Sequence, residues 1–300
     1  RPVKEVYDSI YNDLNKAIGL LGNVDATVNS LVSRGFIDIW GARAALAKVA
    51  FYAKDYPTAI QQSSLLIAQF PLSSRSNFPG IWNDARLDEV IWAIQNNSGD
   101  RGSPFPSAEI MSFRANRNTF GILPAFISTY DTAGFTATGT SRDIRFSTYY
   151  FRRNTIGGAN NWALKKFQGK GTASDNLVNF KVFRVSEMYL IRAAGEIAAN
   201  SDLSALKTAR IENYIHVPLT GSALVAEIAA DRRRELSFEG HRWFDLKRTI
   251  RVVNRPLAGT GNPNTGVQTS LPSSSHRWVW PIPEVEMRAN SSMVQNPGSK

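Results

Sequence analysis

One stretch, from Asp231 to Arg248, constrains the fold of this 300-residue chain more than any other part of the sequence. It reads DRRRELSFEGHRWFDLKR, with six basic and four acidic side chains in eighteen residues, beside aromatic residues of the kind that proteins bury. Leu224 and Ile228 recur before it at helical spacing, and Gly240 is the residue type that most easily ends a helix. The pattern predicts a helix from about Ser222 to about Glu239.

The charges of this stretch can pair with one another. Acids and guanidiniums three or four residues apart share one helix face, and a planar guanidinium suits two-bond pairing with a carboxylate. We interpret the stretch as a structural network of ion pairs. The alternative, a patch that binds phosphate or nucleic acid, requires basic groups without acidic partners. The residues concerned are Asp231, Arg232, Arg233, Arg234, Glu235, Glu239, Gly240, Arg242, Trp243 and Asp245.

The order of residues from Asp231 to Arg248 resembles the C-terminal signature of the SusD/RagB family, the glycan-capturing lipoproteins of the Bacteroidetes outer membrane. That family ends its last long helix with an acidic residue, two or three arginines, Glu-Leu and an aromatic. Glu-Gly, Arg-Trp and Asp-Leu with a basic residue follow. A second match with the family is formed by Trp280-Pro281-Ile282-Pro283, Glu286, Asn290 and Gln295-Asn296-Pro297-Gly298.

Two departures from the family pattern concern local detail. Asp231 stands where the family more often has glutamate, and the usual asparagine and arginine pattern before the helix is blurred from Thr208 to His216. The members of the family are usually longer than this chain. The resemblance therefore implies that a lipidated cysteine and a first helical segment precede Arg1 in the full protein.

The resemblance also carries expectations about fold and role. It implies a mostly α-helical scaffold of the tetratricopeptide type, with irregular loops and a small β-hairpin or sheet region. It further implies an oligosaccharide-binding protein, lipid-anchored to the outer membrane and exposed at the cell surface. Such a protein delivers its ligand to a SusC-like TonB-dependent transporter.

Residues 1–72 predict tetratricopeptide-like helices. The pair from Trp40 to Pro71 resembles one tetratricopeptide unit, with small residues where the helices cross and a proline at the close. We expect residues 73–300 to form the family's C-terminal region, with a loop-rich ligand side, in one compact unit with the first helices. Apolar residues at helical spacing predict the helices Val3–Leu21, Ile37–Lys54 and Thr58–Phe70.

The middle of the chain mixes loops, strands and helices. Residues 98–121 are rich in Gly, Pro, Ser, Asn and Arg, which predicts an irregular loop. Asp143 and Arg145 predict a structural ion pair, and the resemblance implies that Arg184, Glu187 and Glu196 are partners in the interior. Aromatic and β-branched content predicts the strands Phe146–Phe151, Trp162–Phe167 and Asn179–Arg184; helices are predicted over Ile122–Tyr130, Phe183–Glu196 and Leu203–Tyr214.

Composition excludes several classes of function. The formal net charge of +10 invites a nucleic-acid interpretation, but the basic residues are spread along the chain and no recognised nucleic-acid motif is present. The absence of cysteine excludes disulfides, thiol catalysis and thiolate metal sites. No window approaches eighteen uncharged apolar residues, so we predict no membrane-spanning helix.

Catalytic patterns are not found either. The three histidines, His216, His241 and His276, show no metal-ligand spacing, and no Gly-x-Ser-x-Gly elbow is present. We therefore predict a binding protein without enzymatic activity, cofactor or metal.

If the ligand is a sugar, we expect aromatic residues in loops to contact it. Aromatic rings stack on the apolar C–H faces of sugars, while Asn, Asp, Arg and Lys hydrogen-bond the hydroxyl groups. Each candidate can instead be a core or ordinary surface residue, and a helical-repeat protein that binds a peptide or another protein is the main alternative function. The candidate ligand contacts are Phe105, Phe113, Arg114, Asn116, Tyr150 and Trp162.

Overall fold

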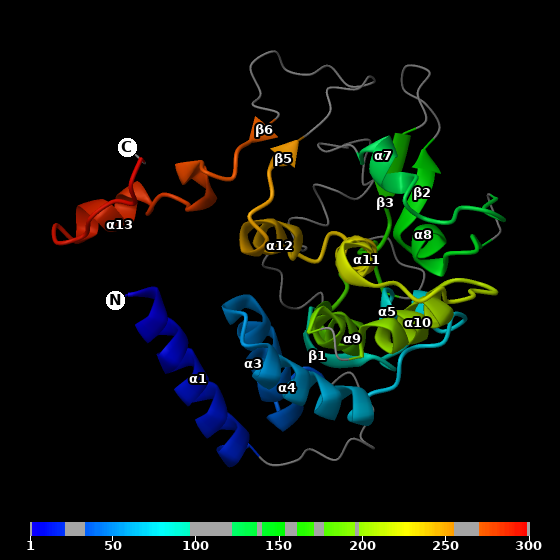
Figure 1. The fold of residues 1–300 in the computed structure, drawn as a ribbon, viewed down its shortest axis with the longest axis horizontal. Helices are drawn as coiled ribbons and strands as arrows, with labels where there is room; N and C mark the ends of the chain where they lie inside the picture. The colour runs from blue at the N-terminus through cyan, green and yellow to red at the C-terminus, as the bar shows by residue number, and fades with distance from the viewer. Residues whose placement is uncertain are drawn as a thin grey trace. The chain divides into compact units, whose positions relative to one another are not determined.

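The computed structural model of the chain describes residues 2–21, 34–96, 122–136, 140–153, 161–170, 177–195, 198–254 and 270–298. It is mostly helical with small two-stranded sheets, which confirms the predicted fold class (Figure 1). The chain forms two compact units, Arg1–Glu235 and Leu236–Lys300. Helices from before and after residue 72 pack together in the first unit.

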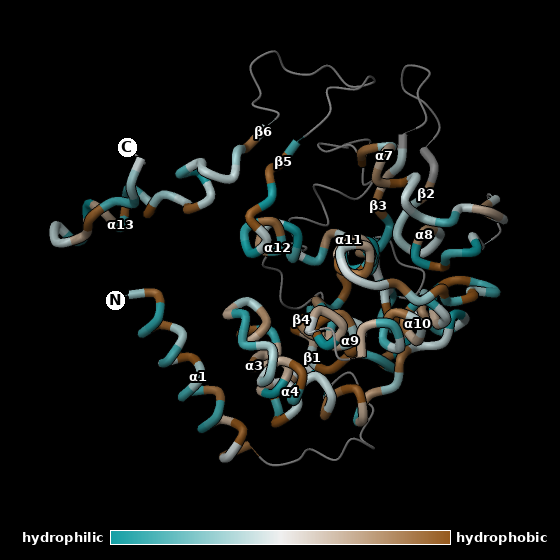
Figure 2. The backbone as a smooth tube through the Cα atoms, in the orientation of Figure 1, coloured by the Kyte–Doolittle hydropathy of each residue, from teal (hydrophilic) through white to brown (hydrophobic). Residues whose placement is uncertain are grey.

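The first helices described in the first unit are α1 (Val3–Leu20), α3 (Ile39–Ala53) and α4 (Tyr56–Gln69). Hydrophobic and hydrophilic residues alternate along α1 in Figure 2, and this helix packs against α3. Asp38 caps α3 by accepting a hydrogen bond from the backbone nitrogen of Gly41, and Asp55 caps α4 through Thr58. The three helices lie within two residues of their predicted bounds.

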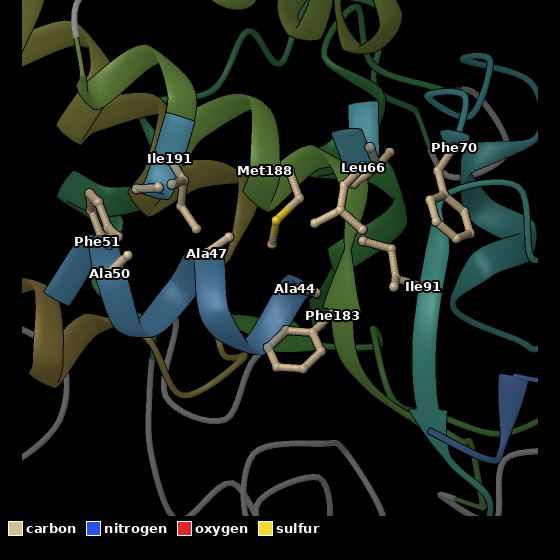
Figure 3. Packing of buried hydrophobic residues seen from close by; sticks show 12 residues of the cluster. Ala44, Ala47, Ala50, Phe51, Leu66, Phe70, Ile91, Phe183, Met188 and Ile191 are labelled. Atoms are coloured by element: carbon tan, nitrogen blue, oxygen red, sulfur yellow. The ribbon is translucent and has the colours of Figure 1, made fainter. Parts of the chain in front are cut away.

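The core of the first unit lies where α3 and α4 meet α9 (Val185–Ala194). Ala44, Ala47 and Ala50 form a row of small side chains along α3, and Met188 and Ile191 of α9 face that row (Figure 3). The small alanine side chains allow the backbones of α3 and α9 to approach closely. Met188 and Ile191 fill the space that remains between the two helices. Other members of this cluster are Phe51, Ala59, Leu66, Phe70, Ile91, Phe183 and Val185.

The described residues of the first unit also contain two short sheets and five further helices. Strand β1 (Val90–Ile94) pairs antiparallel with β4 (Phe180–Arg184), which leads directly into α9. Strand β2 (Tyr150–Arg153) pairs antiparallel with β3 (Asn161–Leu164), so that Arg152 lies opposite Trp162. The helices are α5 (Phe78–Ile81), α7 (Pro124–Ile127), α8 (Ile144–Tyr149), α10 (Ala199–Arg210) and α11 (Gly221–Glu235).

The second unit holds the end of the chain. Its elements are α12 (Arg242–Arg248), strands β5 (Val253–Asn254) and β6 (Ser270–Leu271), the 3-10 helix η1 (His276–Trp278) and α13 (Glu284–Ala289). Gln295 fastens the closing segment, because its side chain accepts from the backbone nitrogen of Ile282 and donates to the carbonyl of the same residue. This pairing imitates one rung of a β-ladder.

Two of the differences between predicted and observed elements have a local cause. Residues 146–149 are helical, because Asp143 caps α8 by accepting a hydrogen bond from the backbone nitrogen of Arg145. The predicted strand therefore starts only at Tyr150. The helix predicted to reach Glu239 ends at Glu235, and Phe238 and Gly240 follow with φ values of 63° and 85° in the left-handed region.

Candidate functional site

A network of buried charges surrounds Glu235, the last residue of α11. Its carboxylate accepts hydrogen bonds from the guanidinium groups of Arg145, Arg184 and Arg210, at nitrogen–oxygen distances of 3.4, 3.0 and 3.0 Å. These arginines come from α8, the end of β4 and the end of α10, and each of the four residues is at most 1% exposed. One carboxylate thus joins elements from four parts of the sequence.

Glu89, immediately before β1, brings a second carboxylate to the same network. It accepts from Arg184 at 2.6 Å and from Arg210 at 2.7 Å. Burial by itself raises the pKa of Glu235, but Arg210, Arg184 and Arg145 outweigh burial and hold that pKa well below its usual range. Glu235 is therefore ionised at neutral pH, and the charges of the network compensate one another.

The preceding turn of α11 extends the pairing. Asp231 accepts from Arg145 at 3.1 Å and from Arg234 at 3.0 Å, while Arg232 donates to Glu187 of α9 at 3.2 Å. Burial raises the pKa of Asp231, but the neighbouring guanidiniums lower it more, and the net shift is downward. Asp231 and Arg232 thus connect α11 to other elements, in addition to the ion pairs within the helix.

The remaining residues of the charged stretch lie in the second unit. Trp243 of α12 contacts Trp278 with ring centroids 4.8 Å apart, and Trp280 with ring centroids 6.2 Å apart, both in tilted geometry. Trp278 is buried and donates its indole N–H to the carbonyl of Pro272, whereas Trp280 is 69% exposed. Glu239, Gly240, Arg242 and Asp245 accompany this stack in the sequence.

The six ligand candidates from the sequence have different outcomes. Tyr150 is fully buried, so its ring offers no face to a ligand, and this candidate is withdrawn. Its hydroxyl lies 3.2 Å from the hydroxyl of Tyr130 inside the first unit. Trp162 is half-buried. Phe105, Phe113, Arg114 and Asn116 lie outside the described residues.

A second half-buried aromatic ring, Phe135, lies beside Trp162 with ring centroids 5.7 Å apart. Both rings contact the fully buried Phe146, Phe135 at 5.0 Å and Trp162 at 4.8 Å. We call Phe135 and Trp162 the aromatic pair. Two partly accessible rings on a buried aromatic floor can stack on the apolar C–H face of a sugar without further ordering of the protein.

The sequence around the aromatic pair explains its position. Gly134 has φ 78°, a backbone conformation that favours glycine, and it turns the chain into Phe135. The backbone nitrogen of Arg142 donates to the carbonyl of Ala133 at 2.7 Å, which ties this turn to the start of α8. Asp143 then pairs with Arg145 at 2.8 Å, as predicted, and connects α8 to the buried charges.

Sequence reasoning missed Phe135. It is an isolated aromatic residue in a polar turn, a pattern that resembles an ordinary surface position. The available signal was the neighbouring Gly134, which marks a turn next to an aromatic residue.

The described part of the chain contains no group of three or more His, Cys, Asp or Glu residues arranged to hold a metal ion. Within that part, no helix combines the length and apolar character that a membrane span requires.

His216, one of the three histidines, holds the connection between α10 and α11. Its Nε2 lies 3.1 Å from the side-chain oxygen of Asn200, and its Nδ1 lies 3.3 Å from the hydroxyl of Tyr214.

Comparison with known proteins places these features in context. Residues 128–298 match the model of the SusD family. A SusD superfamily protein from Bacteroides vulgatus is 23% identical, with a TM-score of 0.78 over 99% of this chain and 66% of that one. A SusD-like carbohydrate binding protein from the same species is 25% identical, with a TM-score of 0.67 over 86% of this chain and 54% of that one.

A laminarin binding SusD-like protein is also similar, with 20% identity and a TM-score of 0.69 over 99% of this chain and 69% of that one. The chain spans less than two thirds of the length of the two Bacteroides vulgatus structures. The search of curated proteins found no match.

Proposed function

The chain belongs to the SusD family, and from that premise we propose that it binds an oligosaccharide, with the aromatic pair Phe135 and Trp162 as a contact surface. The observation that carries this proposal is the pair itself, two half-buried rings supported from beneath by the buried Phe146. Aromatic residues that stay partly in contact with water are costly, and their contact with the buried Phe146 holds them in place for stacking on sugar rings.

Two similar structures support the ligand class. One is described as a SusD-like carbohydrate binding protein and another as a laminarin binding SusD-like protein. These descriptions concern those two proteins, and we propose the same class of ligand for this chain.

We propose that the protein is held at the outer membrane by a lipid anchor and passes its oligosaccharide to a SusC-like TonB-dependent transporter. The support is membership of the SusD family and the two sequence motifs, Asp231–Arg248 and Trp280–Gly298, that carry the resemblance.

Calorimetric titration tests the ligand class. The chain would be titrated with a panel of neutral and acidic oligosaccharides, including laminarin-derived glucans, and with a peptide digest. We expect saturable binding of at least one oligosaccharide and none of the peptides. Binding of peptides without any oligosaccharide would contradict the proposal and favour a peptide-binding helical-repeat protein.

A further inference from the structure

Arg233 differs from the arginines on either side of it. Arg232 pairs with Glu187, and Arg234 pairs with both Asp231 and Glu227. Arg233 is exposed, and no carboxylate pairs with it among the residues that the structure describes. Its guanidinium instead lies over the ring of Phe126, 4.5 Å from the ring centroid.

A guanidinium stacked in this way remains able to bind an anion. Its five N–H donors point outward around the rim of the planar group, so stacking one face on Phe126 leaves the edge available. Neighbouring groups partly desolvate the Arg233 guanidinium and lower its pKa from its usual value, and Tyr130 and Tyr150 oppose that shift. No carboxylate contributes to this balance, so a fixed positive charge is partly desolvated without an acidic partner.

Ring contacts connect Arg233 to the aromatic pair. Phe126 contacts Tyr130 with centroids 5.5 Å apart, Tyr130 contacts Phe146 at 6.1 Å, and Phe146 is the floor beneath Trp162. The Tyr130 hydroxyl also donates to the carbonyl of Arg234 at 2.9 Å, which fixes this part of α11 to the aromatic cluster. Three successive rings, Phe126, Tyr130 and Phe146, therefore separate Arg233 from Trp162, and a ligand that contacts both must be several sugar units long.

We infer that Arg233 binds the carboxylate or sulfate group of an acidic oligosaccharide whose sugar rings contact the aromatic pair. The inference rests on the proposed function and specifies its ligand as an acidic sugar. A guanidinium recognises both carboxylate and sulfate oxygens through paired hydrogen bonds. The formal net charge of +10 also favours an anionic ligand over a neutral one.

The first test uses single sugars and does not require the natural glycan. The Nε–H resonance of Arg233 would be identified in an NMR spectrum by its absence in Arg233→Lys. It would then be followed during titration with glucuronate, glucose 6-sulfate and glucose at constant ionic strength. We expect a saturable shift with glucuronate or with glucose 6-sulfate, which separates the two anions, and none with glucose. Absence of a shift with both anions would overturn the inference.

The second test uses the acidic oligosaccharide that binds best in the calorimetric panel, together with its neutral counterpart prepared by removing the charge. Arg233→Gln is expected to weaken binding of the acidic ligand about tenfold or more and to leave the neutral ligand unchanged. Lys16→Gln removes the same charge from an exposed position on α1 and is expected to change neither affinity. Equal effects of the two variants would reduce the role of Arg233 to net charge and would contradict the inference.

Failure of the inference is distinct from failure of the proposed function. If neutral oligosaccharides bind and Arg233→Gln changes nothing, sugar binding stands and the anion site is overturned. If no oligosaccharide binds, the proposed function fails, and the titration with glucuronate and glucose 6-sulfate still decides whether Arg233 holds an anion. Thermal unfolding of Arg233→Gln checks that the variant is folded.

Discussion

The Nη1 nitrogen of Arg184 lies 3.0 Å from the Oε1 oxygen of Glu235, although 51 positions separate the two residues in the sequence. Arg184 stands where β4 becomes α9, and Glu235 ends α11. Both side chains are buried, so this contact fixes the end of α11 against the interior of the first unit. The charged stretch therefore acts first on tertiary structure, while Arg233 on α11 is exposed and has no carboxylate partner among the described residues.

Glu235→Gln is expected to destabilise the chain by about 3–5 kcal/mol. The substitution removes the negative charge that Arg145, Arg184 and Arg210 share, and it leaves buried guanidiniums with too few acidic partners. The measurement is urea unfolding followed by circular dichroism.

Glu227→Gln is the matched control for that variant. Glu227 also pairs with two basic residues, Lys207 and Arg234, but its side chain is 26% exposed. An ion pair within reach of water contributes about 0–1 kcal/mol, so we expect a small change. Equal losses of unfolding free energy in Glu235→Gln and Glu227→Gln would contradict the conclusion that the buried network stabilises the fold more than a partly exposed ion pair does.

Stability is expected to fall in acid because the pKa values of Glu235 and Asp231 are lower in the folded chain than their ordinary values. Burial raises both values, but nearby arginines lower them more. A carboxylate with a lowered folded pKa contributes stability above its unfolded pKa and loses it as the pH falls toward the folded pKa. The pKa values in the unfolded chain are about 4.3 for Glu and about 3.9 for Asp, so the loss of stability begins at about pH 5.

The buried Asp202 acts in the opposite direction, because burial raises its pKa more than Arg192 lowers it. We expect the two residues of the network to outweigh this single group. Unfolding in urea at a series of pH values measures the balance. A free energy of unfolding that stays constant or rises as the pH falls from about 6 to about 3 would contradict the expectation.

Asp38→Ala is expected to cost about 1 kcal/mol of folding free energy. The Asp38 carboxylate accepts a hydrogen bond from the backbone nitrogen of Gly41 at 2.9 Å, and its loss leaves that buried donor at the start of α3 without a partner. Asp13→Ala, at an exposed position of α1, serves as the control and is expected to change stability by less than about 0.5 kcal/mol. Comparable melting temperatures for the two variants would show that the cap contributes nothing.

The sequence predicted the helices most closely where the apolar spacing is regular. The predicted helix Val3–Leu21 differs by one residue from α1, and Ile37–Lys54 differs by two from α3 at its start. These helices pack one face against a neighbour, so the spacing of apolar residues in the sequence predicts them directly.

The strand predicted over Phe146–Phe151 shows where local composition misleads. Aromatic and β-branched residues favour strands, but Asp143 caps a helix there, and burial of Phe146 and Tyr149 outweighs the local preference. The partners of Glu235 could not be predicted either. They lie 25 to 90 residues away, and spacing within one helix contains no information about such distant residues.

Titration of single-tryptophan variants with the oligosaccharide that binds best tests the central claim most directly. Trp162→Ala is expected to weaken binding about tenfold or more, because it removes one of the two stacking rings. Trp280→Ala removes another accessible tryptophan, 69% exposed, from the second unit and is expected to leave the affinity unchanged. Undiminished binding by Trp162→Ala, or equal loss in both variants, would contradict the assignment of the aromatic pair as the sugar-binding surface.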